Sequence, residues 1–483
     1  MRAFPRIALA ALLVALASVA AARPPNILLL VTDDQRPDTI RALGNGQIDT
    51  PHLDRLVQTG SAFTRAIAAV PHCVPSRAEI LTGASGFTNR SPPFGRAIQP
   101  RLATWAATMR QAGYHAWYSG KWMNDGSPRT RGYEETSALY SAGGAGPGAA
   151  RLTLPTAHNG RPVTGYTGWT FKTNDDQPEP EKGVGLTPLT DRHIADGAIA
   201  LLRRATEQPF FLHVNFTAPH DPLHIPPGYG EKYDPATLPL PPNFLPEHPF
   251  DHGNAGQRDE ALLPVPRDPA AVRREIAAYY AVVSHLDSQV GRILDALRAT
   301  GRDRDTVVIF TSDNGLALGS HGLMGKQNMY EHTIGVPLVL AGPGIPRDRR
   351  FAAQAYLRDL FPTVCELAGI PIPATVEGRS LVPVLAGTVP RIHSELYACW
   401  HRDGVPGAFP MQRMVRTDRW KLIHYAHLER RQLFDLESDP HELRDLSSDP
   451  RHAATMAGLQ RQLDAWFAPR IEAHRAGDPK PGK

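Results

Sequence analysis

The chain is poor in cysteine and has no long run of like charge. Three cysteines occur among its 483 residues, and a domain of this size does not need a disulfide framework. The formal net charge of +4 is spread without basic runs, which argues against a nucleic-acid-binding surface. Charged residues make up 21% and hydrophobic residues 42%, as in soluble globular proteins rather than disordered or fibrous ones.

Beyond its first segment, the chain also lacks an apolar run long enough to cross a membrane. The first segment places Arg2 and Arg6 before 16 uncharged residues, 7–22, and ends in small side chains. This pattern predicts a signal peptide over residues 1–22, and hence an exported protein of the periplasm or extracellular space without a membrane anchor. An uncleaved anchor is the alternative, although spanning a bilayer takes about 20 apolar residues.

The three cysteines need different explanations. Cys365 lies among apolar neighbours in a stretch with helical periodicity, so it is predicted to be a core residue. It could also pair with Cys399, which the sequence leaves open. Cys73 is left over and requires an explanation of its own.

Short apolar runs alternate with helical patterns along the chain. Such runs are typical of strands that are buried on both faces of a sheet. They occupy residues 26–31, 115–118, 210–216, 307–310 and 336–341, and helical patterns occupy 102–112, 190–204 and 269–299. The alternation predicts an α/β fold with a mostly parallel central sheet and helices on both faces.

Two long segments, 126–186 and 222–268, are rich in Pro or Gly and lack periodicity. We interpret them as walls of a substrate cleft, with surface decoration as the alternative. From about Arg391 the chain changes to short segments with turn signals. This change predicts a catalytic domain over residues 23–390 and a smaller C-terminal subdomain over 391–483, with an antiparallel sheet and a final helix near 453–467.

Polar residues follow the ends of several predicted strands. In doubly wound folds, ligands bind beyond the carboxyl ends of the strands. These residues are therefore expected to share one active site: Asp33, Asp34, Lys121, His220, Asp313 and Asn314.

Two of these pairs have the chemistry of a metal site. Asp33-Asp34 and Asp313-Asn314 each follow a buried strand, where an unpaired charge is costly. Neighbouring carboxylates repel each other unless a cation lies between them. Three carboxylates and an amide oxygen suit Ca²⁺ first and Mg²⁺ second. Turn and cap roles are the alternative for either pair alone.

The segment around Cys73 predicts an anion-binding helix terminus. Pro75 suits the first turn of a helix, which places Cys73 at the positive end of the helix. Arg77 follows four residues later and can reach the same side. Free backbone N–H groups and a guanidinium then surround one nucleophile position, where an anion with several oxygens would bind.

The motif Cys73-x-Pro75-Ser76-Arg77, followed by Leu81-Thr82-Gly83, resembles the signature of the sulfatase family in the alkaline-phosphatase superfamily. Further segments resemble that family in order and spacing, and the resemblance spans residues 26 to about 450. They are Asp33-Asp34, Gly120-Lys121-Trp122, Ala218-Pro219-His220, Ser312-Asp313-Asn314-Gly315, Gly325-Lys326 and the turn at 433–440.

The resemblance implies a role for each matched residue. Cys73 would be oxidised to formylglycine by a maturase before folding, and the aldehyde hydrate would attack the sulfur of a sulfated small molecule or glycan. A divalent cation, first Ca²⁺, would be held by Asp33, Asp34, Asp313, Asn314 and the modified Cys73. Arg77 would stabilise the hydrate, and Lys121 and Lys326 would neutralise charge on the sulfate group. Protonated His220 would donate a proton to the leaving alcohol.

One position departs from the family pattern. Many members have a histidine two residues after the first lysine, where this chain has Met123, which cannot take a proton. Asn124 resembles the Lys-x-x-Asn turn of sulfatases that act on the 6-sulfate of glucosamine. The base for sulfate release therefore stays open, and Asn124, His224 and His321 are candidates for contacting substrate. His72, His321, His224 and His332 are candidates for the base, with solvated or structural roles as the alternative, which is favoured for His224 and His332.

Three other functions are compatible with the sequence. A hydrolase of phosphonate esters or phosphodiesters would keep the fold and the formylglycine. A non-catalytic glycan-binding relative would result if Cys73 stays unmodified. A Cys–His hydrolase is less well supported, because it gives the paired acidic residues no role.

Overall fold

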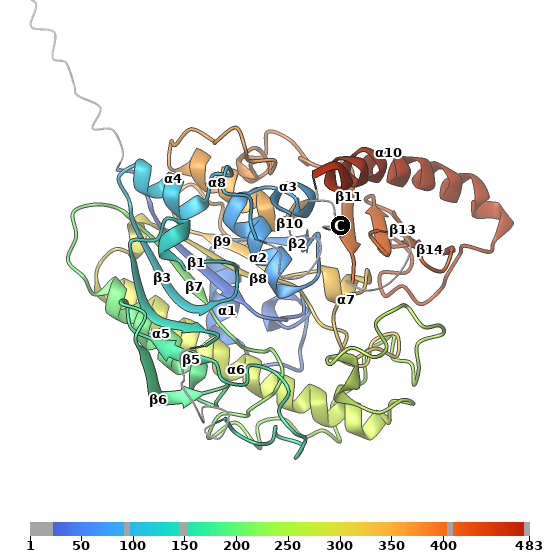
Figure 1. The fold of residues 1–483 in the computed structure, drawn as a ribbon, viewed down its shortest axis with the longest axis horizontal. Helices are drawn as coiled ribbons and strands as arrows, with labels where there is room; N and C mark the ends of the chain where they lie inside the picture. Colours follow the sequence, from blue (N-terminus) through green and yellow to red (C-terminus); the bar gives the residue numbers. More distant parts are fainter. Residues whose placement is uncertain (1–22, 91–96, 144–152, 403–408, 478–483) are drawn as a thin grey trace, which may run out of the picture.

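The computed structural model describes residues 23–90, 97–143, 153–402 and 409–477. The predicted signal peptide, residues 1–22, lies outside the described residues. The described chain forms two sheets, one of ten strands and one of four (Figure 1). None of its helices combines the length and the apolar character needed to cross a membrane.

The larger sheet has the strand order β10-β2-β9-β8-β1-β7-β3-β4-β5-β6. Its central strands β1, β7 and β8 are wholly buried, as their apolar sequences predicted. In chain order the strands are β1 (Asn26–Thr32), β2 (Ser61–Ile67), β3 (His115–Trp122), β4 (Glu135–Ser141), β5 (Thr170–Lys172), β6 (Pro178–Val184), β7 (Phe210–Asn215), β8 (Thr306–Ser312), β9 (Leu338–Ala341) and β10 (Arg349–Tyr356).

Most neighbouring strands of this sheet run parallel. Parallel pairing joins β1 with β7 and β8, β3 with β4 and β7, and β2 with β10. Only pairs that involve β9 or β5 are antiparallel in the described sheet. The predicted α/β fold with a mostly parallel central sheet is confirmed.

The strand expected over residues 336–341 is present as β9, but it runs opposite to β8. Its carboxyl end therefore lies beside the start of β8, where Gly342 packs against the Thr306 carbonyl. The turn after β9 consequently lies at the opposite edge of the sheet from Asp33 and Asp313. A strand's direction is not written in its own sequence, since it depends on which neighbours it pairs with.

Helices cover both faces of the sheet. One face carries α1, α5 and α6, and the other carries α2, α4, α8 and α9 (Figure 1). The α-helices are α1 (Pro51–Thr59), α2 (Cys73–Thr82), α3 (Gly86–Asn89), α4 (Trp105–Gln111), α5 (Thr190–Leu202), α6 (Pro269–Ala299), α7 (Glu331–Ile334), α8 (Leu360–Leu367), α9 (Val382–Leu385) and α10 (Ala453–Gly477). Short 3₁₀ turns lie at Arg41–Leu43, Arg129–Arg131, Glu260–Leu262, Asp303–Asp305, Leu357–Asp359 and Pro450–His452.

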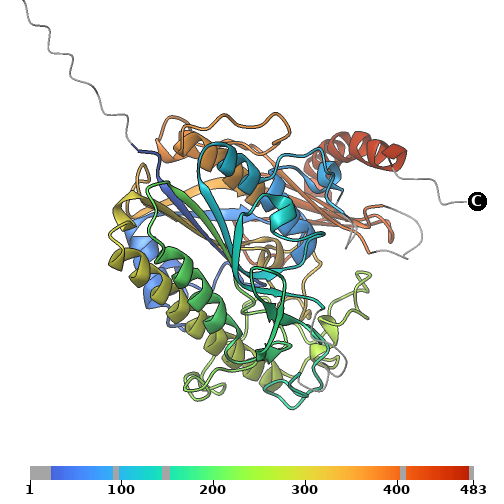
Figure 2. The same cartoon turned by 60° about the vertical axis from the view of Figure 1, so that its left-hand side comes forward.

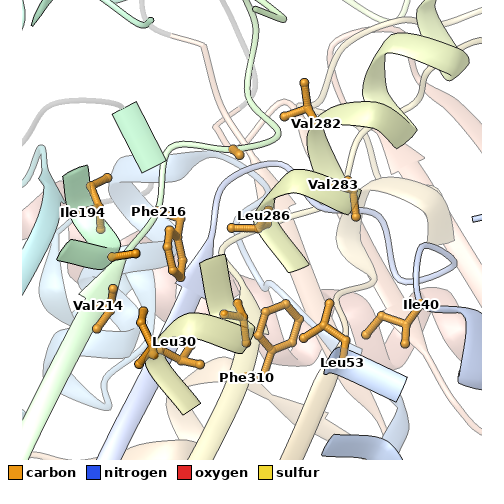
Figure 3. Close-up of a cluster of buried hydrophobic side chains, with 14 of the residues drawn as sticks. Leu30, Ile40, Leu53, Ile194, Val214, Phe216, Val282, Val283, Leu286 and Phe310 are labelled. Atoms are coloured by element: carbon orange, nitrogen blue, oxygen red, sulfur yellow. The ribbon is translucent and has the colours of Figure 1, made fainter. Parts of the chain in front are cut away.

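Alternating side chains of the strands build the two halves of the core. Leu30 of β1 belongs to the cluster under α5 and α6, whereas its neighbours Leu29 and Val31 belong to the cluster on the other face. This is the two-residue period of an extended strand buried on both sides. Figure 3 shows Leu30 near Val214 and Phe310 of the neighbouring strands.

The long helix predicted over residues 269–299 is confirmed as α6. The Asp268 side chain accepts a hydrogen bond from the Ala271 N–H (2.9 Å) and caps the helix, and Pro269 occupies its first position. Gly301 follows its end in a left-handed conformation. Helices α5 and α6 lie side by side along one face of the sheet (Figure 2).

Residues 126–186, which show no periodicity in the sequence, nevertheless contain the strands β4, β5 and β6. Strand β4 pairs in parallel with β3 and extends the sheet, and β5 and β6 follow it as antiparallel strands. β6 is mostly exposed, so its sequence carries no apolar signal. The described part of 222–268 is irregular apart from the turn Glu260–Leu262.

The smaller sheet is antiparallel, as predicted for the end of the chain. Its strands run in the order β11 (Leu396–Trp400), β12 (Gln412–Arg416), β13 (Trp420–Tyr425) and β14 (Arg430–Asp435). Helix α10 packs on this sheet through Leu463 and Phe467 and is longer than the helix expected near 453–467. The same apolar cluster includes Ile67 and Tyr330 of the larger unit, which joins the two.

The three cysteines are all buried and all free. Cys365 lies in the core cluster beneath α8, as predicted, whereas Cys399 lies in the cluster of the smaller sheet. The alternative in which these two form a disulfide is therefore not seen. Each fills an apolar core as a small hydrophobic side chain.

A buried histidine at the contact between the two units gives a prediction for stability. Burial lowers the pKa of His252 to about 3, whereas an unfolded histidine titrates near about 6.5. Between these values the unfolded chain binds one more proton, so stability falls as the pH falls. From pH ~7.5 to ~5.5 this group alone should cost about 1.4 kcal/mol.

His252→Leu should remove that cost. Urea unfolding at the two pH values is expected to show the variant losing about 1.4 kcal/mol less stability than the wild type. Equal losses in the two proteins would contradict the assignment.

Candidate active site

The carboxyl ends of β1, β3, β7 and β8, together with the first turn of α2 after β2, meet at one edge of the larger sheet. The predicted convergence of polar residues is found there. Nine buried side chains come together: Asp33, Asp34, Cys73, Arg77, Lys121, His220, Asp313, Asn314 and Lys326.

Asp33 and Asp34 both face this edge although they are adjacent in sequence. Successive side chains of an extended strand point to opposite faces. Here Asp34 adopts a left-handed backbone conformation (φ 66°), which an aspartate tolerates better than most residues. Its carbonyl accepts from the Tyr279 hydroxyl of α6 (2.5 Å), and its N–H donates to Asp313 Oδ1 (3.1 Å). The turn of the backbone brings both carboxylates into one site.

Cys73 is the first residue of α2, as the position of Pro75 predicted. Its thiol lies 3.2 Å from Asp33 Oδ1 and accepts from Lys326 Nζ at 3.1 Å. Burial and the charge of Asp33 raise the pKa of Cys73 well above its ordinary value. An unmodified thiol here is therefore protonated at neutral pH, which disfavours the Cys–His hydrolase.

Arg77 extends from α2 toward the carboxylates. Its Nε donates to Asp313 Oδ2 at 2.9 Å, and its Nη2 lies 3.3 Å from the Thr32 carbonyl and 3.6 Å from Asp33 Oδ2. Its Nη1 is buried without a hydrogen-bond partner among the described residues. One N–H edge of a buried guanidinium thus stays available to an oxygen ligand.

Lys121 lies within β3, which continues to Trp122, beyond the strand predicted over residues 115–118. A bulge between Ser119 and Gly120 shifts the pairing with β4, and Gly120 has φ 101°. A side chain at Gly120 would collide with the Asn215 carbonyl of β7, so only glycine fits there. The bulge redirects the fully buried Lys121, whose Nζ donates to Asp33 Oδ2.

Lys326 and His220 both adjoin Asp34, whereas Lys121 binds Asp33. Lys326 Nζ donates to both oxygens of Asp34 at 2.7 Å. His220 Nε2 lies 3.7 Å from Asp34 Oδ2. Burial and the charge of Lys326 lower the pKa of His220 well below its ordinary value.

The carboxylates crowd one another. Burial, together with Asp33 and Asp313, raises the pKa of Asp34 to about 8 despite the neighbouring Lys326. Burial would also raise the pKa of Asp33, but the charges of Lys121, His220 and Arg77 hold it well below its ordinary value. Such opposed shifts among adjacent buried carboxylates are typical of functional sites.

The donor set fits a hard divalent cation. Ligand atoms of Asp33, Asp34, Cys73 and His220 all lie within 4.8 Å of one another. Asn314 Oδ1 is buried and has no hydrogen-bond partner among the described residues, so it is a further oxygen available to an ion. Asp313 is a third carboxylate beside this group, and its two oxygens accept from the Asp34 N–H and from Arg77.

A cavity of about 230 Å³ opens beside Cys73. Both long segments that were interpreted as cleft walls contribute to it. Its lining residues are His72, Cys73, Met123, Tyr166, Trp169, His220, Gln257, Arg258, Asp259, Lys326 and Gln327.

Comparison with known proteins decides the family. A family model described as sulfatase matches residues 25–370. The chain belongs to the sulfatase family. A second model, described as the C-terminal part of N-sulphoglucosamine sulphohydrolase, matches residues 319–468. The predicted sulfatase of the alkaline-phosphatase superfamily, a sulfuric-ester hydrolase, is confirmed.

The relatives of this sulfatase are distant but cover its whole fold. An arylsulfatase of Clostridium perfringens (strain 13 / Type A) is 28% identical over 486 residues, covering 94% of this chain and 96% of the relative. A delta 4,5-hexuronate-2-O-sulfatase of Bacteroides thetaiotaomicron is 27% identical and covers 95% and 92%. Among solved structures, a phosphonate monoester hydrolase from Silicibacter pomeroyi is 25% identical, with a TM-score of 0.74 and coverage of 93% and 96%.

Three residues that the sequence offered as substrate contacts do not line the cavity of this sulfatase. Asn124 donates to the Val74 carbonyl at 3.0 Å and so holds the first turn of α2. His321 stacks on the Tyr330 ring, 3.9 Å between centroids, and contacts His332. His224 is half-buried, and burial lowers its pKa to about 4. Of the candidate bases, His72 lies on the cavity wall, whereas His224, His321 and His332 do not.

Sequence reasoning missed several residues that shape the site. The Tyr166 hydroxyl donates to Asp33 Oδ2 (3.1 Å), and the ring packs edge-on against His220. Asp191, in the first turn of α5, accepts from the Thr217 N–H at 2.8 Å and so fixes the segment that carries His220. Arg258 lies in an irregular segment with no periodic signal. Of these, only Asp191 had a local signal, since acidic residues favour the first turn of a helix.

Proposed function

We propose that this sulfatase removes a sulfate ester from a sulfated carbohydrate, using formylglycine made from Cys73. The observation that carries the proposal is the position of Cys73, at the N-terminus of α2 and between Asp33 and Lys326. An aromatic wall of Tyr166 and Trp169 beside it suits a sugar ring. The named activity of the Bacteroides relative on a hexuronate 2-O-sulfate supports a carbohydrate substrate.

The modification gives residue 73 a second reactive hydroxyl. Its hydrated aldehyde supplies one hydroxyl that bonds to sulfur, while the other loses a proton to re-form the aldehyde and expel sulfate. A plain cysteine or serine has no second hydroxyl for that step. Cys73 is 1% exposed in the folded chain, so we expect a maturase to act on it before folding.

The basic side chains bind and neutralise the sulfate group. Lys121 and Lys326 donate to Asp33 and Asp34, the same carboxylates that would hold a cation. Their ammonium groups thus lie where sulfate oxygens would approach, and buried cations stabilise charge that develops there. Arg77, with one N–H edge free of protein partners in the described chain, would orient the hydroxyls at residue 73.

His220 would donate the proton that the leaving alcohol needs. Lys326 is one reason that its pKa is low, so an anionic sulfate group beside that lysine would favour protonation of the imidazole. Met123, on the cavity wall, cannot act as the base for sulfate release. His72 lies on the same wall, and burial with Lys326 lowers its pKa to about 3, which keeps the imidazole neutral but makes it a weak base.

A calcium ion, with magnesium as second choice, would be held by Asp33, Asp34, Asp313, Asn314 and residue 73. When bound, the cation supplies polarisation of a sulfate oxygen and lowers the pKa of the nucleophilic hydroxyl. The neighbouring carboxylates of Asp33 and Asp34 and the Asn314 Oδ1, which has no hydrogen-bond partner among the described residues, support a hard cation.

The proposal includes export to the periplasm or extracellular space after removal of residues 1–22. It also divides the mature chain into a catalytic domain, 23–390, and a C-terminal subdomain, 391–483. Both rest on the sequence pattern.

A second candidate function is hydrolysis of phosphonate monoesters or phosphodiesters. The likeness to the phosphonate monoester hydrolase, with a TM-score of 0.74, favours it. Sulfate and phosphate esters have the same tetrahedral oxyanion geometry, so the two activities differ in charge more than in shape.

Mass spectrometry and a substrate panel test the proposal together. The protein, produced with a formylglycine-generating enzyme, is digested with trypsin, and the peptide 66–77 is expected roughly 18 Da lighter than its cysteine form. On the same preparation, kcat/KM for sulfated sugars should exceed that for a phosphodiester by at least about 10²-fold. The reverse preference would establish the second candidate, and an intact thiol in protein from its native host would favour a glycan-binding role.

A further inference from the structure

Asp221 lies directly behind the His220 imidazole. The Asp221 carbonyl lies 2.5 Å from His220 Nδ1, and Asp221 Oδ1 lies 3.2 Å from the same nitrogen. Two acceptors at Nδ1 favour a proton on that nitrogen and fix the plane of the ring. The other nitrogen, Nε2, then faces the carboxylates at the cavity.

Arg258 joins this acceptor to the lysine side of the site. Its Nη2 donates to Asp221 Oδ1 at 3.0 Å and to Asp259 Oδ1 at 2.5 Å, and its Nε also donates to Asp259 (2.9 Å). Asp259 Oδ2 lies 3.9 Å from Lys326 Nζ. One planar guanidinium thus spans the carboxylates that adjoin His220 and Lys326, a geometry that a lysine ammonium cannot reproduce.

Other segments of the chain pack closely against this guanidinium. A side chain at Gly165 would collide with Arg258 Nη1, so the chain passes close to the arginine just before Tyr166. Arg258 lines both the Cys73 cavity and a neighbouring cavity of about 340 Å³, which Asp221 also lines. The arginine is therefore held from several sides rather than lying freely on the surface.

The charges at this position balance one another. Burial and neighbouring Asp259 raise the pKa of Asp221 to about 6, and the charge of Arg258 opposes that rise. Burial opposes the charge of Arg258, but Asp221 and Asp259 raise its pKa above the ordinary value. The cation keeps both buried carboxylates ionised and in place.

We propose that Arg258 is a positioning residue for the leaving-group acid: by holding Asp221 against His220 Nδ1, it directs Nε2 toward the ester oxygen that departs. The assignment rests on the proposed function of His220. Arg258 itself touches neither the nucleophile nor the sulfate-binding lysines.

Proton donation matters most when the departing alcohol is a poor leaving group. 4-Nitrophenol leaves readily as an anion, whereas phenol and alkyl alcohols need a proton in the transition state. Loss of a positioned acid should therefore reduce the rate with poor leaving groups selectively. A residue needed only for folding or substrate binding would affect all esters alike.

The experiment measures kcat and KM of the mature enzyme on 4-nitrophenyl sulfate, phenyl sulfate and an alkyl sulfate. Arg258→Met is expected to lower kcat/KM by about 10²-fold on phenyl and alkyl sulfate, through kcat, and by less than about 3-fold on 4-nitrophenyl sulfate. Arg258→Lys should fall between this variant and the wild type, and it carries the test if Arg258→Met does not fold. Arg292→Met removes a partly exposed arginine paired with Asp196 on the surface and should behave as the wild type.

A double-mutant cycle identifies the partner. His220→Asn should show the same leaving-group selectivity, and adding Arg258→Met to it should cost less than about 3-fold more. Uniform losses on all esters in an otherwise folded variant, or fully additive effects with His220→Asn, would overturn the positioning role alone. A wild type that cleaves no sulfate ester would instead refute the proposed function, and the role of Arg258 with it.

Discussion

Cys73→Ala is expected to abolish sulfate-ester hydrolysis, lowering kcat/KM by about 10⁴-fold or more. The variant has neither a thiol nor an aldehyde, so the site keeps its cations but has no atom to attack sulfur. Because Cys73 is a small buried side chain at the edge of a polar cavity, its loss should cost only about 1 kcal/mol of stability. Steady-state kinetics and thermal unfolding measure the two effects.

Cys365→Ala and Cys399→Ala are the matched controls, since both cysteines are equally buried and free but lie in apolar clusters. They should lose some stability and keep the wild-type kcat. Retention of more than a few per cent of activity in Cys73→Ala would rule out residue 73 as the nucleophile. If the wild type is inactive and binds a sulfated glycan as tightly as Cys73→Ala does, the protein functions in glycan binding.

Removal of divalent cations is expected to lower both stability and activity. Three buried carboxylates lie together at the site, and a dication that binds only the folded state stabilises it by mass action. Calcium at about 100 times its dissociation constant should raise the free energy of unfolding by about 2.7 kcal/mol. Calorimetry of chelated protein, with calcium and then magnesium added back, measures this increment; the increment for calcium should be the larger.

Asp34→Asn should lose the calcium increment and at least about 10³-fold in kcat. The substitution removes a charged ligand but preserves the shape of the side chain. Asp196→Asn, which changes a partly exposed carboxylate on the surface of α5, should keep both the increment and the rate. If calcium stabilises Asp34→Asn as much as the wild type, the cation binds elsewhere in the protein.

The segments that could be predicted from the sequence are those whose signal is local. Helix α6 has its Asp268 cap, its first-turn proline and its apolar periodicity within one stretch of chain. The central strand β1 is apolar on both faces because it is buried on both faces. The direction of β9 and the existence of β6 depend on partners far away in sequence, and neither leaves a pattern in its own residues.

The residues of the site also fall into those that the sequence predicts and those that it does not. Residues at strand ends, such as Asp33 and Asp313, could be predicted to lie together, because the carboxyl ends of parallel strands share one edge of the sheet. The sequence did not indicate the side-chain contacts of Asn124 and His321, which are with the Val74 carbonyl and the Tyr330 ring. The direction of each of these side chains depends on tertiary contacts, which the neighbouring sequence does not record.

By itself, the sequence predicted which polar residues lie together at one edge of the sheet: a cysteine at a helix start, and Asp33-Asp34 and Asp313-Asn314 after buried strands. These are local patterns, and the chemistry needs them in that form. Only the tertiary structure decided what surrounds these residues. Tyr166 and Arg258 lie beside them and belong to irregular segments. No periodicity or motif predicts the position of these segments, because it depends on packing between residues that are far apart in the chain.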